Sequence, residues 1–496
     1  MTEKPKKKAI LSKSTFIKGM QCPKALYLHK NRYFLRDPLS AEQLARFSRG
    51  TDVGIYAQNL FPGGVDASPK THFQMAQSVV KTAALIQQPE VNVIYEAAFE
   101  HEEVIVALDI LYRENNQWKG VEVKSSRGIS ETYRWDAALQ YYVITGSGLE
   151  LEDFSVAYIN EDYKRQGGVD AHQLFHMESL LNLVKERREG IAQKVQELKD
   201  VTRLKNSPPV PIGVQCNHPY PCDFRGHCWK KVPADSVFLI EGISEEQKFE
   251  WYHAGMASVD DLPAGIANDR EWSVQIQSIK EKKVIVDKPA LAAFLQTCET
   301  AQVFQPFLFA PVVPFFDNTS PYQSLPFGTG KTHAGNSAPE IKMENYAAFS
   351  LEAAVTNMLE ASKSSKCLWV VGAAKIKELL ANCKILYPLL ENDLELLSGK
   401  LKDLLAPLER GMVVYPGMKV PLSAEKILKH FGAESAEFPE KCMIPEQADA
   451  LFQKLISNPD WENNAGIADQ LEVYMQSKTD NLYRLLQLWT NLLSEV

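Results

Sequence analysis

Two carboxylates, a lysine and a glutamine between positions 109 and 140 have the types and spacing of a metal-assisted hydrolytic site. In "VIVALDIL", alternating residues predict a strand that carries Asp109 on one face. The next expected strand, "WKGVEVK", carries Glu122 and Lys124 on one face, because they are two residues apart. Carboxylates that hold a divalent cation beside an ammonium group suit the hydrolysis of a phosphodiester.

The turn between the two strands decides whether these side chains meet. Asn115 and Asn116 predict a two-residue turn, since Asn tolerates positive φ. Counting back from that turn brings Asp109 opposite Glu122, with Cβ atoms about 5 Å apart. Two opposed carboxylates repel, and a divalent cation between them removes the repulsion; oxygen ligands suit Mg²⁺ or Mn²⁺. Lys124 would orient the attacking water or stabilise developing negative charge.

A helix and a further strand complete this part of the chain. Ser130 is a suitable N-cap for a helix to about Thr145, and Asp136 and Gln140 share a face of it because they are four residues apart. The strand spans residues 154–160. The alternative is an ordinary solvated strand face, since a Glu-x-Lys pair is common by chance.

Four cysteines flank this segment. Cys216, Cys222 and Cys228 are spaced six apart in "VQCNHPYPCDFRGHCW", where Pro and Gly favour a loop around a metal centre. Cys22 supplies a fourth thiol at a turn that enters a helix, in "QCPKALYLHK". Four thiolates suit zinc or an iron–sulfur cluster, and the spacing does not choose between them. Alternative zinc ligands are His218 and His227.

The combined pattern resembles the PD-(D/E)XK nuclease superfamily, and within it the RecB-family nucleases with an iron–sulfur clasp. The resemblance covers residues 12–233 and implies a metal ion on Asp109 and Glu122, with Lys124 and Gln140 completing the catalytic set. It also implies a structural [4Fe–4S] cluster that ties the start of the domain to its end, held by Cys22, Cys216, Cys222 and Cys228. The family often adds an acidic residue or His from the first helix, for which the candidates are Glu42 and Asp52; Glu96 is interpreted as a strand-edge residue.

The composition is that of an ordinary globular chain. It has 496 residues, 45% hydrophobic and 23% charged, with a net charge of -8. The negative charge counts against a protein that coats DNA, but it allows a local basic groove. We expect no membrane span, no signal-peptide core and a cytoplasmic location with reduced thiols. The remaining cysteines are expected to be unpaired core residues: Cys298, Cys367, Cys383 and Cys442.

The middle of the chain gives weaker signals. A long helix is expected at about 171–204, and short helices at 238–285, where a helical hairpin could grip a nucleic-acid backbone but is more often a plain connector. "PFGTGKTH" lacks the first Gly of a phosphate-binding loop, because that position is Leu325, so we expect no ATP site.

The last third mixes strand-like residues around 367–371 with expected helices at 389–408 and 467–494. It loosely resembles the RNase H-like domain of the DEDD exonuclease type that follows a RecB-like nuclease in a group of uncharacterised bacterial proteins. The strand that should carry an Asp-x-Glu pair reads "FLFAP" and has no acid. The resemblance therefore implies a degenerate domain that scaffolds or binds a partner, with acids left at Asp317, Asp403 and Asp480.

The expected architecture is α/β throughout. It comprises a PD-(D/E)XK restriction-endonuclease-like core with the iron–sulfur clasp (1–235), a helical connector (236–285) and a degenerate RNase H-like domain (286–496). The expected function is Mg²⁺- or Mn²⁺-dependent DNA hydrolysis in repair or defence, on DNA that is single-stranded or has free ends. A protein partner would bind through the C-terminal domain. The alternatives are a catalytically inactive nucleic-acid-binding or complex-assembly protein, and an RNA-processing enzyme.

Overall fold

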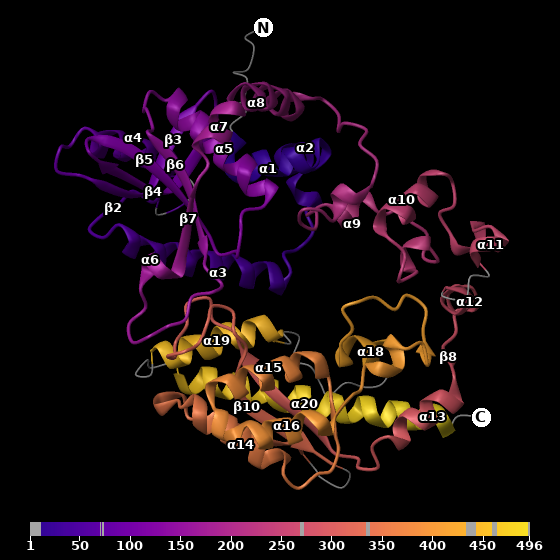
Figure 1. The fold of residues 1–496 in the computed structure, drawn as a ribbon. Coiled ribbons are helices and arrows are strands. Elements are labelled where there is room, and N and C mark those ends of the chain that lie inside the picture. Colours follow the sequence, from indigo (N-terminus) through magenta and orange to yellow (C-terminus); the bar gives the residue numbers. More distant parts are fainter. Residues whose placement is uncertain are drawn as a thin grey trace. The chain divides into compact units, whose positions relative to one another are not determined.

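The structure is a computed structural model that describes residues 11–69, 71, 74–267, 272–333, 338–432, 443–458 and 464–494. The chain divides into two compact units (Figure 1). The first comprises the residues up to Lys231 with Val312–Pro321, and the second comprises Val232–Pro311 with the residues from Tyr322 onward. Both combine helices with β-sheet, which confirms the predicted α/β class.

The first unit is built on a seven-stranded sheet in the order β2-β3-β4-β5-β6-β7, with β1 added parallel to β4. The β3–β4–β5 strands are antiparallel, whereas β5 and β6 are parallel and are connected by α5 (Glu131–Gly146). The strands are β1 (Leu11–Ser12), β2 (Val65–Asp66), β3 (Val93–His101), β4 (Val104–Glu114), β5 (Gln117–Lys124), β6 (Asp153–Ile159) and β7 (Phe175–Ser179).

Alternation along β4 gives this sheet one fully buried face. Val104, Val106 and Leu108 are buried, whereas Ile105 and Asp109 are half-buried. The core around the buried face includes residues of α1 (Lys13–Gln21), α4 (Met75–Ile86), α5 and α8 (Arg188–Arg203). As predicted, Ser130 caps α5, because its side chain accepts a hydrogen bond from the Tyr133 N–H.

The prediction of one long helix at about 171–204 is wrong. The segment divides into α6 (Ala171–Leu174), β7, α7 (Leu181–Glu186) and α8. Five residues of β7 pair with β6, so the open edge of the sheet outweighs the local helical pattern.

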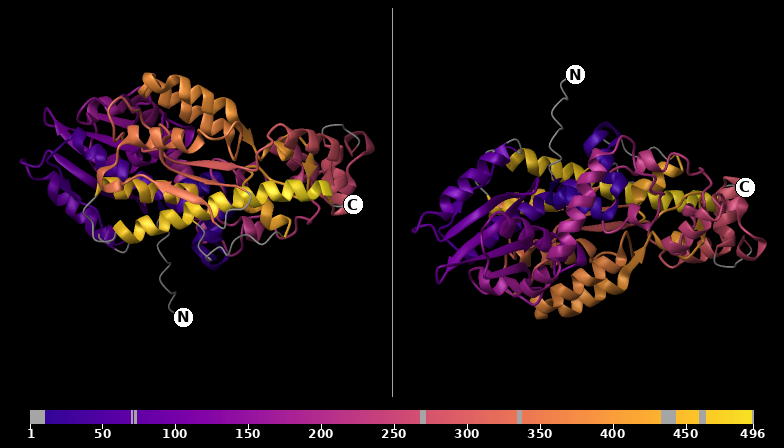
Figure 2. Two further views of the ribbon diagram at one scale, coloured as in Figure 1. Left: turned by 90° about the horizontal axis from the view of Figure 1, so that it is seen from below. Right: turned by 90° about the horizontal axis from the view of Figure 1, so that it is seen from above.

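The second unit contains a five-stranded sheet in the order β11-β10-β9-β12-β13. Its first three strands in the chain are antiparallel, and β12 is parallel to both β9 and β13. Helix α20 (Asn464–Ser494) packs along β9 and β10 and is the long yellow helix in Figure 2. The strands are β9 (Val303–Phe309), β10 (Leu325–Thr332), β11 (Glu340–Met343), β12 (Leu368–Val370) and β13 (Leu401–Asp403).

Two features of this sheet test predictions made from the sequence, one of a helix and one of a loop. The segment expected as a helix at 389–408 contains β13 between α16 (Glu391–Lys400) and α17 (Ala406–Glu409), so that prediction is wrong in part. The "PFGTGKT" segment is β10 and not a loop, which bears out the exclusion of a phosphate-binding loop. Its Gly330 packs against α20, where an added Cβ would lie 2.0 Å from Thr479 Oγ1.

The predicted short helices of 238–285 are present and belong to the second unit. They are α10 (Glu245–His253), α11 (Ala264–Ala267) and α12 (Ser273–Glu281), with 3-10 turns at Val237–Leu239 and Val259–Asp261. They enclose a small apolar core of their own, which includes Val237, Trp251, Val259 and Ile276.

The cysteines outside the first unit differ from the expectation of free thiols. Cys298 and Cys367 form a disulfide, because α13 (Lys288–Gln296) and β12 bring their Cα atoms to 5.6 Å across the same core. Cys383 is a buried free thiol, as predicted, and Cys442 lies outside the described residues. None of the helices described has the length and apolar character needed to cross a lipid bilayer.

Candidate metal-dependent active site

The hairpin that carries the candidate carboxylates has the predicted turn and register. Asn115 and Asn116 adopt φ values of 50° and 64°, and the ladder runs from Glu114–Gln117 to Ile110–Val121. Asp109 follows at the end of this ladder, where its Oδ2 accepts a hydrogen bond of 2.6 Å from the Val123 N–H. The Asp109 carboxyl therefore lies against the β5 segment that carries Glu122 and Lys124.

A third carboxyl group joins this row and corrects the interpretation of Glu96 as a strand-edge residue. Strand β3 pairs with β4 through Tyr95–Ile110 and Ala97–Leu108, so Glu96 lies at the level of Asp109. Glu96 has a φ of 53°, an uncommon conformation for a residue other than glycine, and interrupts the ladder at this position. Three neighbouring strands thus each present one carboxyl group at the same level.

Two ammonium groups converge on the Glu122 carboxylate. Lys124 Nζ lies 2.6 Å and Lys13 Nζ lies 2.7 Å from the same atom, Glu122 Oε1. Lys124 Nζ also lies 2.6 Å from Asp136 Oδ2, so it bridges β5 and α5. The Glu122 side chain is only 2% exposed, so these contacts form in a largely dry site where charge interactions are strong.

Lys13 was missed by the sequence reasoning. It is the first residue of α1, directly after β1, and it reaches the site because Ser12 pairs with Ile105 on β4. Its only local signal is the Ser12 N-cap, which predicts where the helix begins but not which strand lies beneath it.

Gln140 closes the site from α5. Its Nε2 lies 3.5 Å from Asp136 Oδ1, so the two residues share the predicted helix face. Within the described part of the chain, Gln140 Oε1 and Glu122 Oε2 are buried and have no hydrogen-bond partner. A buried oxygen without a partner is costly, which makes these two atoms available ligands for a cation.

The charges shift the pKa values of the carboxyl groups in opposite directions. Burial, followed by the negative charge of Glu122, raises the pKa of Asp109 to about 8. Burial also raises the pKa of Glu96, although Lys13 opposes the rise. Burial alone would raise the pKa of Glu122, but Lys124 and Lys13 outweigh it and lower that pKa well below its usual range.

The charge balance of the cluster matches a divalent cation. Four carboxyl groups (Glu96, Asp109, Glu122, Asp136) face two ammonium groups (Lys13, Lys124), which leaves a surplus of two negative charges when every group is ionised. As the described side chains stand, no three His, Cys, Asp or Glu residues form a group that could hold a metal ion. The donor types, the two unpartnered oxygens and the charge surplus fit Mg²⁺ or Mn²⁺.

Of the two first-helix candidates, only Asp52 has a described side chain. Asp52 is exposed on α3 (Ala41–Ala57), and the side chain of Glu42 lies outside the described residues. Lys13, from α1, is the residue that the first helix contributes.

The four candidate cysteines line one small cavity. Cys22 is the N-cap of α2 (Pro23–Asn31), and the Cys222 N–H donates to the Cys216 carbonyl, which closes the loop that ends at Cys228. All four are free thiols, and apolar neighbours such as Phe224 surround them.

Burial raises the pKa of the Cys22 and Cys228 thiols, and raises the pKa of Cys222 to about 11. Without a cation these sites hold thiols. The four thiols line one cavity, and cysteine thiolates are the donor type that zinc and iron–sulfur centres use.

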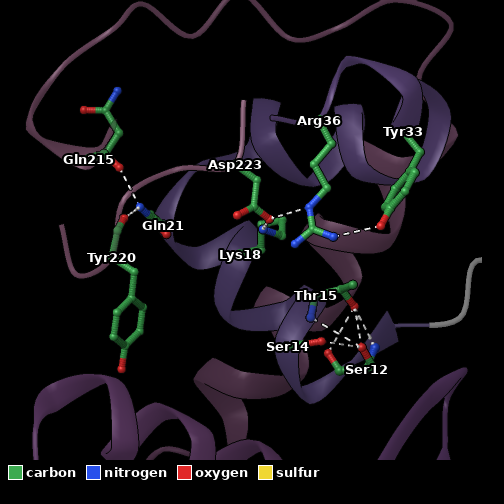
Figure 3. A network of polar contacts seen from close by, with 10 residues as sticks. All are labelled: Ser12, Ser14, Thr15, Lys18, Gln21, Tyr33, Arg36, Gln215, Tyr220 and Asp223. Atoms are coloured by element: carbon green, nitrogen blue, oxygen red, sulfur yellow. Dashed lines mark hydrogen bonds and ion pairs between the residues drawn. The ribbon is translucent and has the colours of Figure 1, made fainter. Parts of the chain in front are cut away.

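Polar contacts join the cysteine loop to the first helix (Figure 3). Asp223 Oδ2 lies 2.6 Å from Lys18 Nζ and 3.2 Å from Arg36 Nε. Gln21 Nε2 donates to the carbonyls of Gln215 (2.8 Å) and Tyr220 (2.7 Å). Helix α1 therefore contacts the carboxyl cluster at its start and the cysteine loop at its end.

The acids of the last third have structural partners. Asp403, at the end of β13, accepts hydrogen bonds from the N–H groups of Gly372, Ala373 and Leu405, so it caps α15 (Ala373–Leu386). Asp480 pairs with Arg484 one turn further along α20. Asp317 lies in the first unit, where it accepts a hydrogen bond from the Gly167 N–H.

Comparisons with known proteins assign neither a family nor a function to this chain. No protein-family model matches the chain, and no curated protein matches it. Among solved structures, a protein named SSO0001 overlaps with 13% identity and a TM-score of 0.24, over 47% of this chain and 91% of that one. An alkaline exonuclease (LHK-Exo) from Laribacter hongkongensis overlaps with 11% identity and a TM-score of 0.22, over 40% and 93%. Likenesses at this level carry no conclusion about function.

Proposed function

We propose that this chain is a Mg²⁺- or Mn²⁺-dependent deoxyribonuclease whose active site is the carboxyl cluster on β3, β4 and β5. The observation that carries the proposal is Glu122, a buried carboxylate with one oxygen bound by two lysines and the other without a partner among the described residues. A site with a surplus of negative charge and open oxygen ligands suits a divalent cation.

Asp109, Glu122 and Gln140 would hold the cation. Bound there, it supplies Lewis-acid chemistry that lowers the pKa of a water molecule and neutralises the phosphate. Lys124, fixed between Glu122 and Asp136, would orient the attacking water and stabilise the charge that develops on the phosphate.

The experiment is a cleavage assay on protein purified without oxygen. Labelled single-stranded DNA, duplex DNA and RNA are incubated with Mn²⁺ or Mg²⁺, with wild type beside Lys124→Ala and Glu122→Gln. We expect wild type to cut DNA and both variants to lose at least about a hundredfold in rate, because each removes charge stabilisation in a dry site. Equal cutting by wild type and both variants would refute the proposal.

We also propose that Cys22, Cys216, Cys222 and Cys228 hold a structural [4Fe–4S] cluster. The shared cavity and the polar contacts of α1 support a clasp that joins the start of the unit to its end. All four ligands come from protein, so the cluster has no open position for substrate. A brown protein with about four iron atoms per chain is expected, and a colourless protein with zinc would overturn this assignment.

The second unit is proposed to be a degenerate RNase H-like domain that binds a protein partner. Strand β9 has no acidic residue, and Asp403 and Asp480 already have hydrogen-bond or ion-pair partners, which supports the loss of a two-metal site. The competing function for the whole chain is a catalytically inactive nucleic-acid-binding protein. The cleavage assay separates the two, since such a protein would bind DNA without cutting it.

A further inference from the structure

We propose that the exposed segment "KNRYF" (residues 30–34) is a binding surface on which the bases of single-stranded DNA stack. The inference rests on the proposed nuclease function and adds the surface that holds the substrate. Tyr33 and Phe34 are 54% and 76% exposed, and Lys30 and Arg32 beside them are also exposed. Interleaved aromatic and cationic side chains are the chemistry that binds single strands, since aromatic rings stack on bases while cations contact phosphates.

The Tyr33 ring is exposed but held in position. Arg36 Nη1 donates a hydrogen bond of 2.8 Å to the Tyr33 hydroxyl, and the guanidinium carbon lies 5.6 Å from the ring centroid. The His29 ring meets Tyr33 edge-on, with the centroids 5.3 Å apart. An aromatic ring that is fixed before binding loses little conformational entropy when a base stacks on it.

The surroundings of this surface are positive although the chain carries a net charge of -8. Burial, followed by the nearby charges of Lys18, Lys30 and Arg36, lowers the pKa of His29 to about 4. A local positive field attracts a polyanion and opposes the overall negative charge. Aromatic rings can stack on bases while the neighbouring cations contact phosphates, so this surface is complementary to a single-stranded nucleic acid.

Helix α1 connects this surface to the carboxyl cluster. Lys13 at its start contacts Glu122. Further along the helix, Lys18 contacts Asp223, which also binds Arg36 (Figure 3). Lys13 and Lys18 are separated by about 7.5 Å along the helix axis. A strand whose bases stack on Tyr33 and Phe34 would thus lie near the candidate active site.

The test measures DNA affinity separately from cleavage. Full-length Asp109→Ala protein, purified without oxygen, is titrated with a fluorescent oligothymidine of about 20 nucleotides and with a duplex of the same length. The additional changes Tyr33→Ala and Phe34→Ala should weaken single-strand affinity at least tenfold and duplex affinity less than threefold. Arg32→Ala should lower the slope of log affinity against log salt by about 0.7, the value for one phosphate contact.

A control pair, Val80→Ala and Met177→Ala, removes exposed apolar side chains elsewhere on the same unit and should change neither affinity. If the Tyr33 and Phe34 changes leave single-strand affinity intact, or weaken both forms equally, the surface is wrong. The nuclease proposal is judged by cleavage alone. Wild type that cuts DNA while the surface variants bind normally would keep the nuclease and reject the surface. If wild type does not cut DNA but the surface variants bind single strands more weakly, the binding surface is kept and the nuclease proposal is rejected.

Discussion

The two sheets place their acidic residues in opposite situations. In the first unit, Glu122 is 2% exposed, shares one oxygen between two lysines and has a second oxygen without a partner among the described residues. In the second unit, Asp403 also stands at the end of a strand, but it accepts three backbone N–H groups and caps a helix. The first carboxylate leaves an open ligand in a crowded negative site, whereas the second is used for folding. Burial of an acid near a strand end therefore does not by itself favour a metal site; the open oxygen and the surplus of charge are what make the first unit the candidate.

Replacing one acid in each sheet should have opposite effects on DNA cleavage and on stability. The largest expected effect is the loss of cleavage in the first unit. Asp109→Asn is expected to lower DNA cleavage by about a thousandfold or more, because a lost metal ligand removes several kcal/mol of transition-state stabilisation. Its stability should not fall, since a neutral amide replaces a carboxyl group that burial keeps protonated. Cleavage assays and urea unfolding of the same preparations measure both quantities.

Asp403→Ala is the matched change in the second unit. It should leave cleavage unchanged and lower the free energy of unfolding by about 1–2 kcal/mol, as expected when a helix loses its cap. If Asp403→Ala abolished cleavage while Asp109→Asn did not, the active site would have to be reassigned to the second unit.

The sequence was sufficient for the parts of this site that short-range rules determine. The Asn115-Asn116 turn determines the register of the hairpin, so the approach of Asp109 to β5 could be predicted. Helical spacing likewise placed Asp136 and Gln140 on one face. The α/β class followed from the same strand and helix patterns.

Long-range pairing determines what the sequence did not reveal. Lys13 enters the site only because β1 pairs with β4, a contact between Ser12 and Ile105 that no local pattern specifies. The sequence does not reveal that Glu96 joins the cluster, because its positive φ cannot be inferred from its residue type. The Cys298–Cys367 disulfide spans 69 residues and depends on how α13 and β12 pack.

The next comparison concerns two lysines that each pair with a glutamate. Lys13 binds Glu122 in the first unit, and Lys478 binds Glu425 at 2.7 Å in the second. Lys13→Met should lower kcat about tenfold, because it removes one charge-assisted hydrogen bond to Glu122, and should lower the Mn²⁺ concentration needed for half-maximal rate, because a competing cation is gone. Lys13→Arg should retain most of the turnover.

Lys478→Met should leave kcat and the Mn²⁺ requirement unchanged while it lowers the free energy of unfolding by about 1–3 kcal/mol. A purely structural role for Lys13 predicts the same pattern as for Lys478. An unchanged kcat together with an unchanged Mn²⁺ requirement in Lys13→Met would therefore remove Lys13 from the site.

The smallest effect is a pH dependence of stability that differs between the two units. The pKa of Asp109 is raised to about 8 in the folded chain, so between the unfolded value of about 3.9 and that pH the folded state holds a proton that the unfolded state has lost. This carboxyl group therefore lowers the free energy of unfolding as pH rises through that window, by up to about 1.4 kcal/mol per pH unit. Asp109→Asn should remove this slope of unfolding free energy against pH, measured between pH 6 and 8 without divalent ions. Added Mn²⁺ should flatten the slope, because the bound cation displaces the proton from the folded state. Glu425 behaves oppositely: burial opposes ionisation, but Lys478 prevails and lowers its pKa, so its contribution is lost only as pH falls below the usual range for a glutamate. Glu425→Gln should therefore alter stability in the acid range alone. If the slope between pH 6 and 8 persists in Asp109→Asn, the carboxyl cluster is not its origin.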